Sequence, residues 1–415
     1  MDPITAVAPA AGALDNFPRR LAFIPLAVGV ALLVIAMYRN RGNFAKVSMS
    51  EFYAWSSELR AGGNPWQASG DPAFKPLPGV LHLGHCNYPP AFLMAFEPLT
   101  MLPVRAAYWL WQGIILACLL AATLIVAHDL GPPADAAPYA LAAGAALLFP
   151  ETYGTFYESQ LNFILLLLLV VSYACDRRGR SIAAGLTLAL AMLFKMFPGL
   201  AAGYFLLRRR WATLAWAIVF GVLGMVLTSA RSQYAFMQSG VLHSSWLADD
   251  AWLRNDRSIA VYSNLRALLD WLSGGSLPEP LIPLWLGLTA LACALTVVMT
   301  AAATRRPARS AEGEVASYGL WLTAAIIVSP ISWGHYLPLI LPLLFGLAVD
   351  AIRNTRKSTI ARLLVVTGLI ALFATYFAGA LRQRHILFVA TVLIFAGSAW
   401  LVGQSQKSSE TRVSL

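Results

Sequence analysis

The stretch VRAAYWLWQGIILACLLAATLIVA, residues 104–127, decides the fold. After Arg105 it carries no charged side chain, and about 20 such residues are enough to cross the hydrocarbon core of a bilayer as a helix. Apolar runs of spanning or near-spanning length recur at about 21–38, 136–150, 161–176, 211–229, 280–303, 316–330, 336–352, 360–379 and 385–403. We therefore expect an all-α integral membrane protein with about twelve membrane helices, two of them in a broken run at 181–207.

The amino-acid composition excludes a soluble protein. Only 12% of the 415 residues are charged, 58% are hydrophobic, and the mean hydropathy is +0.64. A water-facing surface needs about a quarter of its residues charged, so most of this surface must face hydrocarbon. A cytosolic enzyme, a disulfide scaffold and a disordered chain are therefore excluded.

The basic residues predict the orientation of the chain in the membrane. The net charge is +10, but Lys and Arg fall in short clusters between the apolar runs, which indicates positive-inside topology and argues against nucleic-acid binding. The clusters are Arg19-Arg20, Arg177-Arg178-Arg180, Arg208-Arg209-Arg210, Arg305-Arg306-Arg309 and Arg353-Arg356-Lys357-Arg362. We expect cytoplasmic tails at 1–20 and 404–415 around one polytopic transmembrane domain at 21–403.

Two long loops then face the outside, at 39–103 and 230–279. Each carries apolar residues at helical spacing, which predicts amphipathic helices lying on the membrane surface. These residues are Phe52, Trp55 and Leu59 in the first loop and Leu265, Leu268, Leu269 and Leu272 in the second. The run at 89–102 is apolar but short, and Glu97-Pro98 interrupts it, so we predict a re-entrant or interfacial helix there.

Lys195 is a candidate functional residue because it is a lone cation between apolar segments. The sequence FKMFPG around it contains no acid, and Pro198 breaks the helix, so residues 181–207 are predicted to form a hairpin of two short helices. A charged side chain beside the membrane core costs several kcal/mol unless it is paired. Lys195 would neutralise the phosphate of an anionic lipid, or it is a lysine that reaches to the interface.

Two further outward-facing segments carry polar and aromatic residues. His335 lies in the turn SPISWGHY, between two apolar helices, as a functional or simply hydrogen-bonded interfacial histidine. The run YGTFYESQLN, residues 153–162, combines a carboxylate, amides and aromatic rings at the outer end of a helix. This mixture suits sugar hydroxyls and ring faces, although helix capping uses the same residue types.

No pattern for a metal ion or a nucleotide cofactor is present. His82, His85 and Cys86 lie close in sequence, but no second ligand cluster completes a coordination sphere. Walker, Rossmann, nucleophile-elbow, HExxH and EF-hand motifs are absent. Asp249, Asp250, Arg254, Asp256, Arg257 and Arg266 would bind phosphate or form solvated salt bridges with one another. We expect neither a cofactor nor a metal.

The order and spacing of several short motifs resemble glycosyltransferase family 87. This family is the polyprenol-phosphate-mannose-dependent mannosyltransferase branch of the GT-C superfamily of integral-membrane proteins. The resemblance covers about residues 48–345. The matching stretches are Glu51-Phe52-Tyr53, Gly62 to Trp66, Asn87 to Pro90, Glu97-Pro98-Leu99, Leu102-Pro103, Glu158 to Asn162, Phe194 to Pro198, Leu206 to Trp211, Asn264-Leu265-Arg266 and Ser329 to Tyr336.

The resemblance implies a GT-C fold and a reaction. A sugar, mannose first of all, would pass from a polyprenyl-phosphate donor to a lipid or glycan acceptor with inversion, on the outer face of the bacterial inner membrane. Inversion needs a carboxylate base and cations for the departing phosphate. The family's aspartate position falls on Ser48, so Glu51, three residues later, becomes our candidate base, with Asp71 next.

The resemblance also assigns the remaining site residues. His335 is grouped with the catalytic residues and, with Lys195, contacts the donor phosphate, while Arg266 is a weaker helper. Sugar or acceptor binding is assigned to Tyr53, Tyr88, Glu158, Gln160, Asn162 and Trp333. The expected partners are the polyprenyl-phosphate-sugar donor, the acceptor and membrane lipids.

Two other classes of protein fit the composition. A lipid or sugar transporter, or a flippase, also has many apolar helices with sparse charge, but here the polar residues gather at one membrane face and no inverted repeat is visible. A catalytically inactive scaffold for envelope assembly is the third candidate, because Ser48 stands at the acid position. Consumption of the donor without a gradient would separate a transferase from a flippase.

Overall fold

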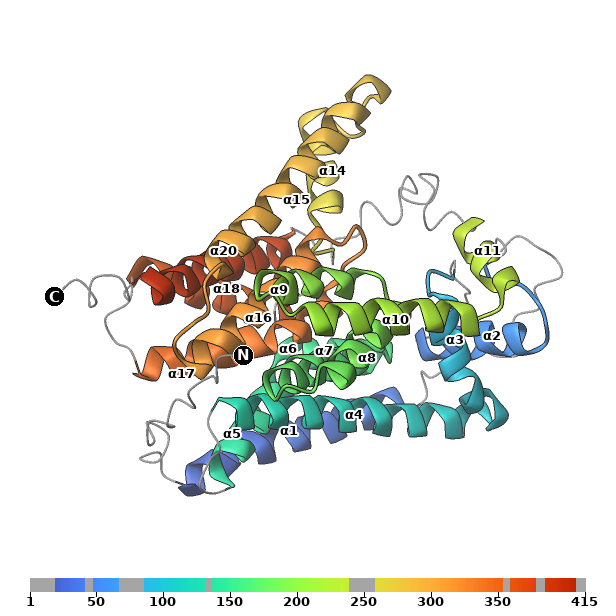
Figure 1. Cartoon of the computed structure of the whole chain (residues 1–415), viewed down its shortest axis with the longest axis horizontal. Helices are drawn as coiled ribbons and strands as arrows, with labels where there is room; N and C mark the ends of the chain where they lie inside the picture. The colour runs from blue at the N-terminus through green and yellow to red at the C-terminus, as the bar shows by residue number, and fades with distance from the viewer. Residues whose placement is uncertain are drawn as a thin grey trace.

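The computed structural model describes residues 19–41, 48–66, 86–130, 136–238, 258–353, 359–377 and 385–407. All regular elements within these residues are helical, and the only β feature among them is an isolated bridge between Ser258 and Trp333 (Figure 1). The elements are α1 (Arg19–Asn40), α2 (Ser48–Arg60), α3 (Pro90–Phe96), η2 (Glu97–Met101), α4 (Val104–Asp129), α5 (Ala137–Leu148), α6 (Pro150–Glu158), α7 (Asn162–Arg177), α8 (Ser181–Phe194), η3 (Phe197–Ala201), α9 (Ala202–Leu207), α10 (Trp211–Leu227), α11 (Ala230–Gln238), α14 (Val261–Leu272), η4 (Glu279–Leu281), α15 (Ile282–Thr304), α16 (Ala311–Val328), η5 (Gly334–Ile340), α17 (Leu341–Arg353), α18 (Thr359–Phe377) and α20 (Ile386–Lys407).

Several of these helices are long and apolar enough to cross a membrane. Within the described residues there are five such helices, and up to seven if two bent pairs each form one span. The pairs are α6 with α7, bent by 118°, and α10 with α11, bent by 98°. Shorter apolar helices are α5, α8, η3 with α9, and most of α18. A polytopic all-helical protein is therefore confirmed, whereas the count of about twelve crossings stays a prediction.

The broken run at 181–207 folds as a hairpin. Helix α8 ends at Phe194, and Lys195 then adopts an extended conformation with φ −157° and ψ 138°, before η3 and α9 continue the chain. The residues that flank the run meet again, since Arg210 Nε lies 3.2 Å from Asp176 Oδ2. The predicted pair of short helices is confirmed, with Lys195 at the far end from the arginines.

Three of the arginine clusters, at 177–180, 208–210 and 305–309, lie at one end of the described helix bundle. Arg208 donates a hydrogen bond of 2.6 Å to the carbonyl oxygen of Thr304 and forms an ion pair with Glu314 at 3.1 Å. Arg178 pairs with Asp129 at 2.6 Å, at the end of α4. Segments far apart in the sequence thus place their basic residues together, as positive-inside topology requires.

The described segments of the loop predicted at 39–103 lie at the other end of α4. Trp111 on α4 donates a hydrogen bond of 2.8 Å to the Ser159 carbonyl and precedes Asp129 by 18 residues, about 27 Å along a helix axis. Helices α2, α3 and α11 lie together at one end of the molecule (Figure 1). The run at 89–102 forms α3 and η2. Its seven-residue helix is too short to span, as predicted.

The two predicted surface helices form, but they use their apolar faces differently. In α2, Phe52 and Trp55 are buried, and Phe52 packs edge-on against Tyr88 at a ring-centroid distance of 4.8 Å. The apolar face of α2 therefore covers the protein itself. In α14, Leu268, Trp271 and Leu272 are exposed, and this face is the one available to the membrane surface.

Candidate active site

Lys195 is the centre of a buried cluster at the end of the bundle opposite the arginine clusters. Its Nζ donates to the hydroxyl of Tyr336 and, at 3.4 Å, to the hydroxyl of Tyr88. The same atom lies 4.3 Å from the ring centroid of Tyr336 and 4.7 Å from that of Tyr88, within cation–π range. Lys195 is 9% exposed. No carboxylate among the described residues forms an ion pair with it.

A chain of hydrogen bonds leads from this cation to helix α2. The Tyr88 hydroxyl donates to Gln160 Oε1 at 2.9 Å, and Gln160 Nε2 donates to Ser48 Oγ at 2.7 Å. Ser48, at the position where the family resemblance expects the base, therefore reaches the lysine cluster through two side chains. All of these residues lie in or next to the motifs identified in the sequence, but their direct connection is a property of the fold.

The corner between α6 and α7 holds Gln160 in place. Ser159 ends α6 in the left-handed conformation, with φ 53°. Its carbonyl accepts the Trp111 hydrogen bond described above, and its hydroxyl accepts one of 2.7 Å from Gln112 Nε2. Two side chains of α4 thus fix this corner, which explains why Gln160 is buried and aimed at Tyr88.

The turn that carries His335 is held by its main chain. The His335 carbonyl accepts hydrogen bonds of 2.8 Å from both Thr155 Oγ1 and Asn162 Nδ2. The buried imidazole packs against Trp333 and Tyr336, at ring-centroid distances of 5.5 and 4.8 Å. His335 is therefore next to the lysine cluster, while Asn162 uses its amide to position this turn.

Glu51 approaches the cluster from the first turn of α2. Burial, followed by the nearby Tyr336 phenol and Glu51 carboxylate, raises the pKa of Tyr88 well above its ordinary value. Burial, with a smaller contribution from Glu51, also raises the pKa of the Cys86 thiol. Tyr88 thus stays neutral and keeps its proton for Gln160, and Glu51 lies within electrostatic range of both side chains.

Two residues beside the site carried no predicted role. Tyr336 binds Lys195 directly, although the motif SPISWGHY had drawn attention only to its histidine and tryptophan. A Cβ atom built on Gly334 would lie 3.2 Å from Glu151 Oε2, so the Glu151 carboxylate packs against the turn just before His335. The sequence did contain a signal for Glu151, because it is an acid directly after Pro150 at the start of a helix.

The structure places Tyr53 away from the cluster. Its hydroxyl donates to the carbonyl oxygens of Leu102, at 2.8 Å, and Thr100, at 3.1 Å. These hydrogen bonds connect α2 to η2 and the start of α4. Tyr53 thus has a bracing role, and its predicted contact with a sugar stays a prediction.

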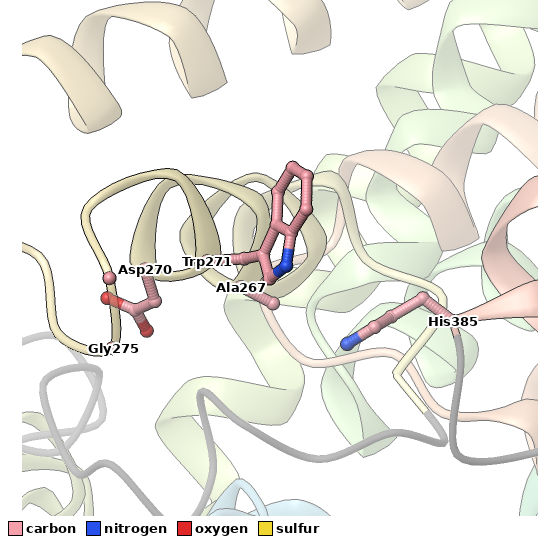
Figure 2. Close-up of a pocket in the computed structure, with 6 residues that line it drawn as sticks. Ala267, Asp270, Trp271, Gly275 and His385 are labelled. Atoms are coloured by element: carbon pink, nitrogen blue, oxygen red, sulfur yellow. The ribbon is translucent and has the colours of Figure 1, made fainter.

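Arg266 is likewise engaged elsewhere. Its Nε lies 2.9 Å from Asp270 Oδ1, and its guanidinium lies 5.2 Å from the ring centroid of Trp285. Asp270, Trp271 and His385 line an open pocket of about 550 Å³ beside α14 (Figure 2). Arg266 therefore forms its described contacts with Asp270 and Trp285, and its predicted role at the donor phosphate stays a prediction.

The remaining predicted residues have these places. Glu158 is the last residue of α6 and is half-buried, and Trp333 is half-buried against His335. Asp71, His82, His85, Asp249, Asp250, Arg254, Asp256 and Arg257 lie outside the described residues. Among the described residues, no group of three or more His, Cys, Asp or Glu side chains could hold a metal ion.

The helical bundle and the polar cluster together define the class of protein. The chain is a polytopic helical membrane protein with a buried cation at the end opposite its arginine clusters. The family model of glycosyltransferase family 87 matches residues 87–330, more than half of the chain. The chain therefore belongs to glycosyltransferase family 87, and the resemblance seen in the sequence is confirmed.

Characterised relatives share part of the chain. It is 28% identical over 310 residues to a polyprenol-phosphate-mannose-dependent alpha-(1-2)-phosphatidylinositol mannoside mannosyltransferase of Mycolicibacterium smegmatis, covering 68% of this chain and 66% of the relative. A pentamannoside mannosyltransferase of the same organism is 25% identical over 278 residues, covering 65% and 63%. A phosphatidylinositol mannoside mannosyltransferase of Mycobacterium tuberculosis is 27% identical over 301 residues, covering 68% and 66%. The chain thus spans slightly less than two thirds of these relatives.

Proposed function

We propose that the protein is a membrane hexosyltransferase that moves mannose from a polyprenyl-phosphate donor to a lipid or glycan acceptor. The observation that carries this proposal is the buried Lys195, held by two tyrosine hydroxyls and without an ion-pair partner among the described side chains. The named relatives use polyprenol-phosphate-mannose as donor and phosphatidylinositol mannosides as acceptors. The phosphate of such a donor would supply the negative charge that the lysine cluster lacks.

The chemistry of the departing phosphate explains the lysine. A buried cation without an anion is costly, because its desolvation is not offset by an attractive charge. A lipid phosphate supplies that anion, and its negative charge grows as the bond to the sugar breaks. Lys195 is then better paired in the transition state than in the empty site, which is the requirement for electrostatic catalysis. His335, beside Tyr336, supplies a second polar contact for the phosphate.

The acceptor hydroxyl needs a base if the reaction proceeds with inversion. We propose Glu51 for this role, because it lies one helical turn from Ser48 and close enough to affect Tyr88. A single displacement of this kind needs no metal ion: the base removes the acceptor proton and the lysine stabilises the leaving phosphate. Gln160 and Tyr88 then position the side chains around the sugar.

We further propose a GT-C fold with about twelve crossings in a bacterial inner membrane, with the lysine cluster on the outer face. Support comes from the helix hairpin at Lys195 and from the separation of the site and the arginine clusters along α4. That separation is close to the thickness of a bilayer's hydrocarbon core. Donor and acceptor would then meet at the outer surface, with the donor tail between helices.

The test is sugar transfer by membranes that contain the wild-type protein, Glu51→Gln or His335→Ala. They are supplied with labelled decaprenyl- and undecaprenyl-phospho-mannose and with an acceptor lipid extract. We expect transfer by the wild type and its loss in both variants. Transfer that survives in Glu51→Gln would move the base to another acid, with Asp71 and Glu151 tested next.

Two outcomes would contradict transferase activity altogether. A donor that crosses the membrane chemically unchanged would identify a flippase. A wild-type protein that consumes no phospho-sugar, while its Ser48→Asp variant does, would identify an inactive relative in which Ser48 is the cause.

A further inference from the structure

A groove of about 510 Å³ lies between α15 and α20, at the arginine-rich end of the bundle. Its walls are formed by small apolar side chains, including Ala302 on α15 and Ala396 and Ala399 on α20. The two helices approach closely there, since a Cβ atom added to Gly403 would lie 3.9 Å from the Cα atom of Ala303. The groove is therefore an apolar channel bounded by two membrane helices.

The mouth of the groove is polar and basic. Arg305 and Arg306 follow the last residue of α15 and are both exposed. Trp400, which is 54% exposed, and Gln404 complete the mouth from α20. Apolar walls beneath a pair of guanidinium groups and a tryptophan are typical of the level where lipid head groups meet the hydrocarbon.

The surrounding helices favour a lipid-facing position for the groove. The Thr304 carbonyl, directly before Arg305, accepts the hydrogen bond from Arg208, so the mouth lies at the same end as the other arginine clusters. The α15 segment, Glu279–Thr304, is the least buried of the five long candidate spans, with 11% of its apolar window buried. Its apolar surface is therefore exposed on the outside of the bundle.

We propose that this groove binds an anionic glycerophospholipid. The lipid phosphate lies between the guanidinium groups of Arg305 and Arg306, whose planar donors match phosphate oxygens. One acyl chain lies along the alanine walls, where small side chains leave room for continuous van der Waals contact. A second copy of the chain is disfavoured as the occupant, since a symmetric contact would bring the two arginine pairs together.

The experiment uses lipid-stripped, full-length protein in detergent and native mass spectrometry. Phosphatidylglycerol is titrated against phosphatidylcholine with the same acyl chains, and inorganic phosphate tests the head-group charge alone. We expect a preference of about tenfold for phosphatidylglycerol, which corresponds to about 1.4 kcal/mol. Both lipids offer phosphate oxygens to the arginines, but the choline cation of phosphatidylcholine offsets its negative charge. Arg305→Gln/Arg306→Gln should abolish the preference, and Ala302→Phe should weaken both lipids by filling the groove.

The control removes the same charge elsewhere on the same end. Arg180 and Arg209 are also exposed, and Arg180→Gln/Arg209→Gln should keep the full preference. Thermal unfolding without added lipid checks that each variant is folded. If one of the two groove variants does not fold, the other is sufficient to test the proposal. Any of four results would overturn the proposal. The Arg305/Arg306 variant could keep the wild-type preference for phosphatidylglycerol, or the control variant could lose that preference equally. Ala302→Phe could bind both lipids as the wild type does, or inorganic phosphate could displace the lipid.

Discussion

At the scale of single residues, we expect replacement of Lys195 to lower activity without lowering stability. Lys195→Met removes a buried cation while keeping most of the side-chain volume. Turnover should fall about 10²- to 10³-fold, as when one group that stabilises a transition-state anion is removed. The melting temperature without donor should stay the same or rise, because the desolvated charge has no ion-pair partner among the described residues.

Enzyme assays with saturating donor and thermal unfolding in detergent measure the two effects. A variant in which activity and melting temperature fall together would show that Lys195 holds the fold and has no separate role at the phosphate. Lys195→Arg is the matched control, since it keeps the charge but changes its shape, and it should retain more activity than Lys195→Met.

Tyr53 and Tyr88, which both lie in the loop predicted at 39–103, should separate a bracing role from a catalytic one. Tyr53→Phe loses hydrogen bonds to main-chain oxygens of residues 100 and 102, so stability should fall by about 1 kcal/mol. Its kcat and the KM for the acceptor should remain at wild-type values. Tyr88→Phe removes the link between Lys195 and Gln160 and should lower kcat. Steady-state kinetics with both variants checks this, and a raised acceptor KM in Tyr53→Phe would restore Tyr53 to the sugar site.

At the scale of elements, the hairpin that presents Lys195 depends on close packing of α8 against α10. A Cβ atom on Gly185 would lie 2.4 Å from Trp216 Cβ and 2.8 Å from the Thr213 carbonyl oxygen. Gly185→Ala should therefore force the helices apart and destabilise the protein by about 1–3 kcal/mol. Activity should fall as well, because Lys195 is carried by the end of α8.

Gly221 on α10 provides the matched control. A Cβ atom there would meet nothing within 4 Å, so Gly221→Ala should leave stability unchanged or slightly raise it. Denaturant unfolding and sugar transfer by the two variants give the comparison. Equal losses in both would mean that glycine flexibility, and not close packing at residue 185, is what the helices require.

Prediction from sequence succeeded where the cause is local. The apolar runs and the Pro198 break identified the helices and the Lys195 hairpin, because bilayer crossing and helix breaking depend on neighbouring residues. The pairing of Ser48 with Gln160, 112 positions apart, depends on how α2 meets the α6–α7 corner. Tyr53 shows the same limit: it follows the Glu51-Phe52 motif, but its position on the helix directs it to η2.

At the scale of the whole molecule, function depends on two opposite ends. One end carries Lys195, Tyr88 and Gln160, and the other carries ion pairs such as Arg210 with Asp176. Under the proposed function, a polyprenyl-phosphate donor would present its phosphate to the end that carries the lysine cluster. Orientation in the membrane would then decide in which compartment the proposed sugar transfer takes place.

Cysteine labelling tests that orientation directly. Tyr157, on α6 beside the site, is 47% exposed, and Arg180, between α7 and α8, is exposed at the opposite end. In a background with Cys86, Cys118, Cys175 and Cys293 replaced, Tyr157→Cys should react in spheroplasts with a membrane-impermeant maleimide. Arg180→Cys should react only after permeabilisation, because the arginine clusters are retained in the cytoplasm. The reverse pattern would place the lysine cluster in the cytoplasm, and labelling of both from outside would break the assignment of the two ends to opposite faces.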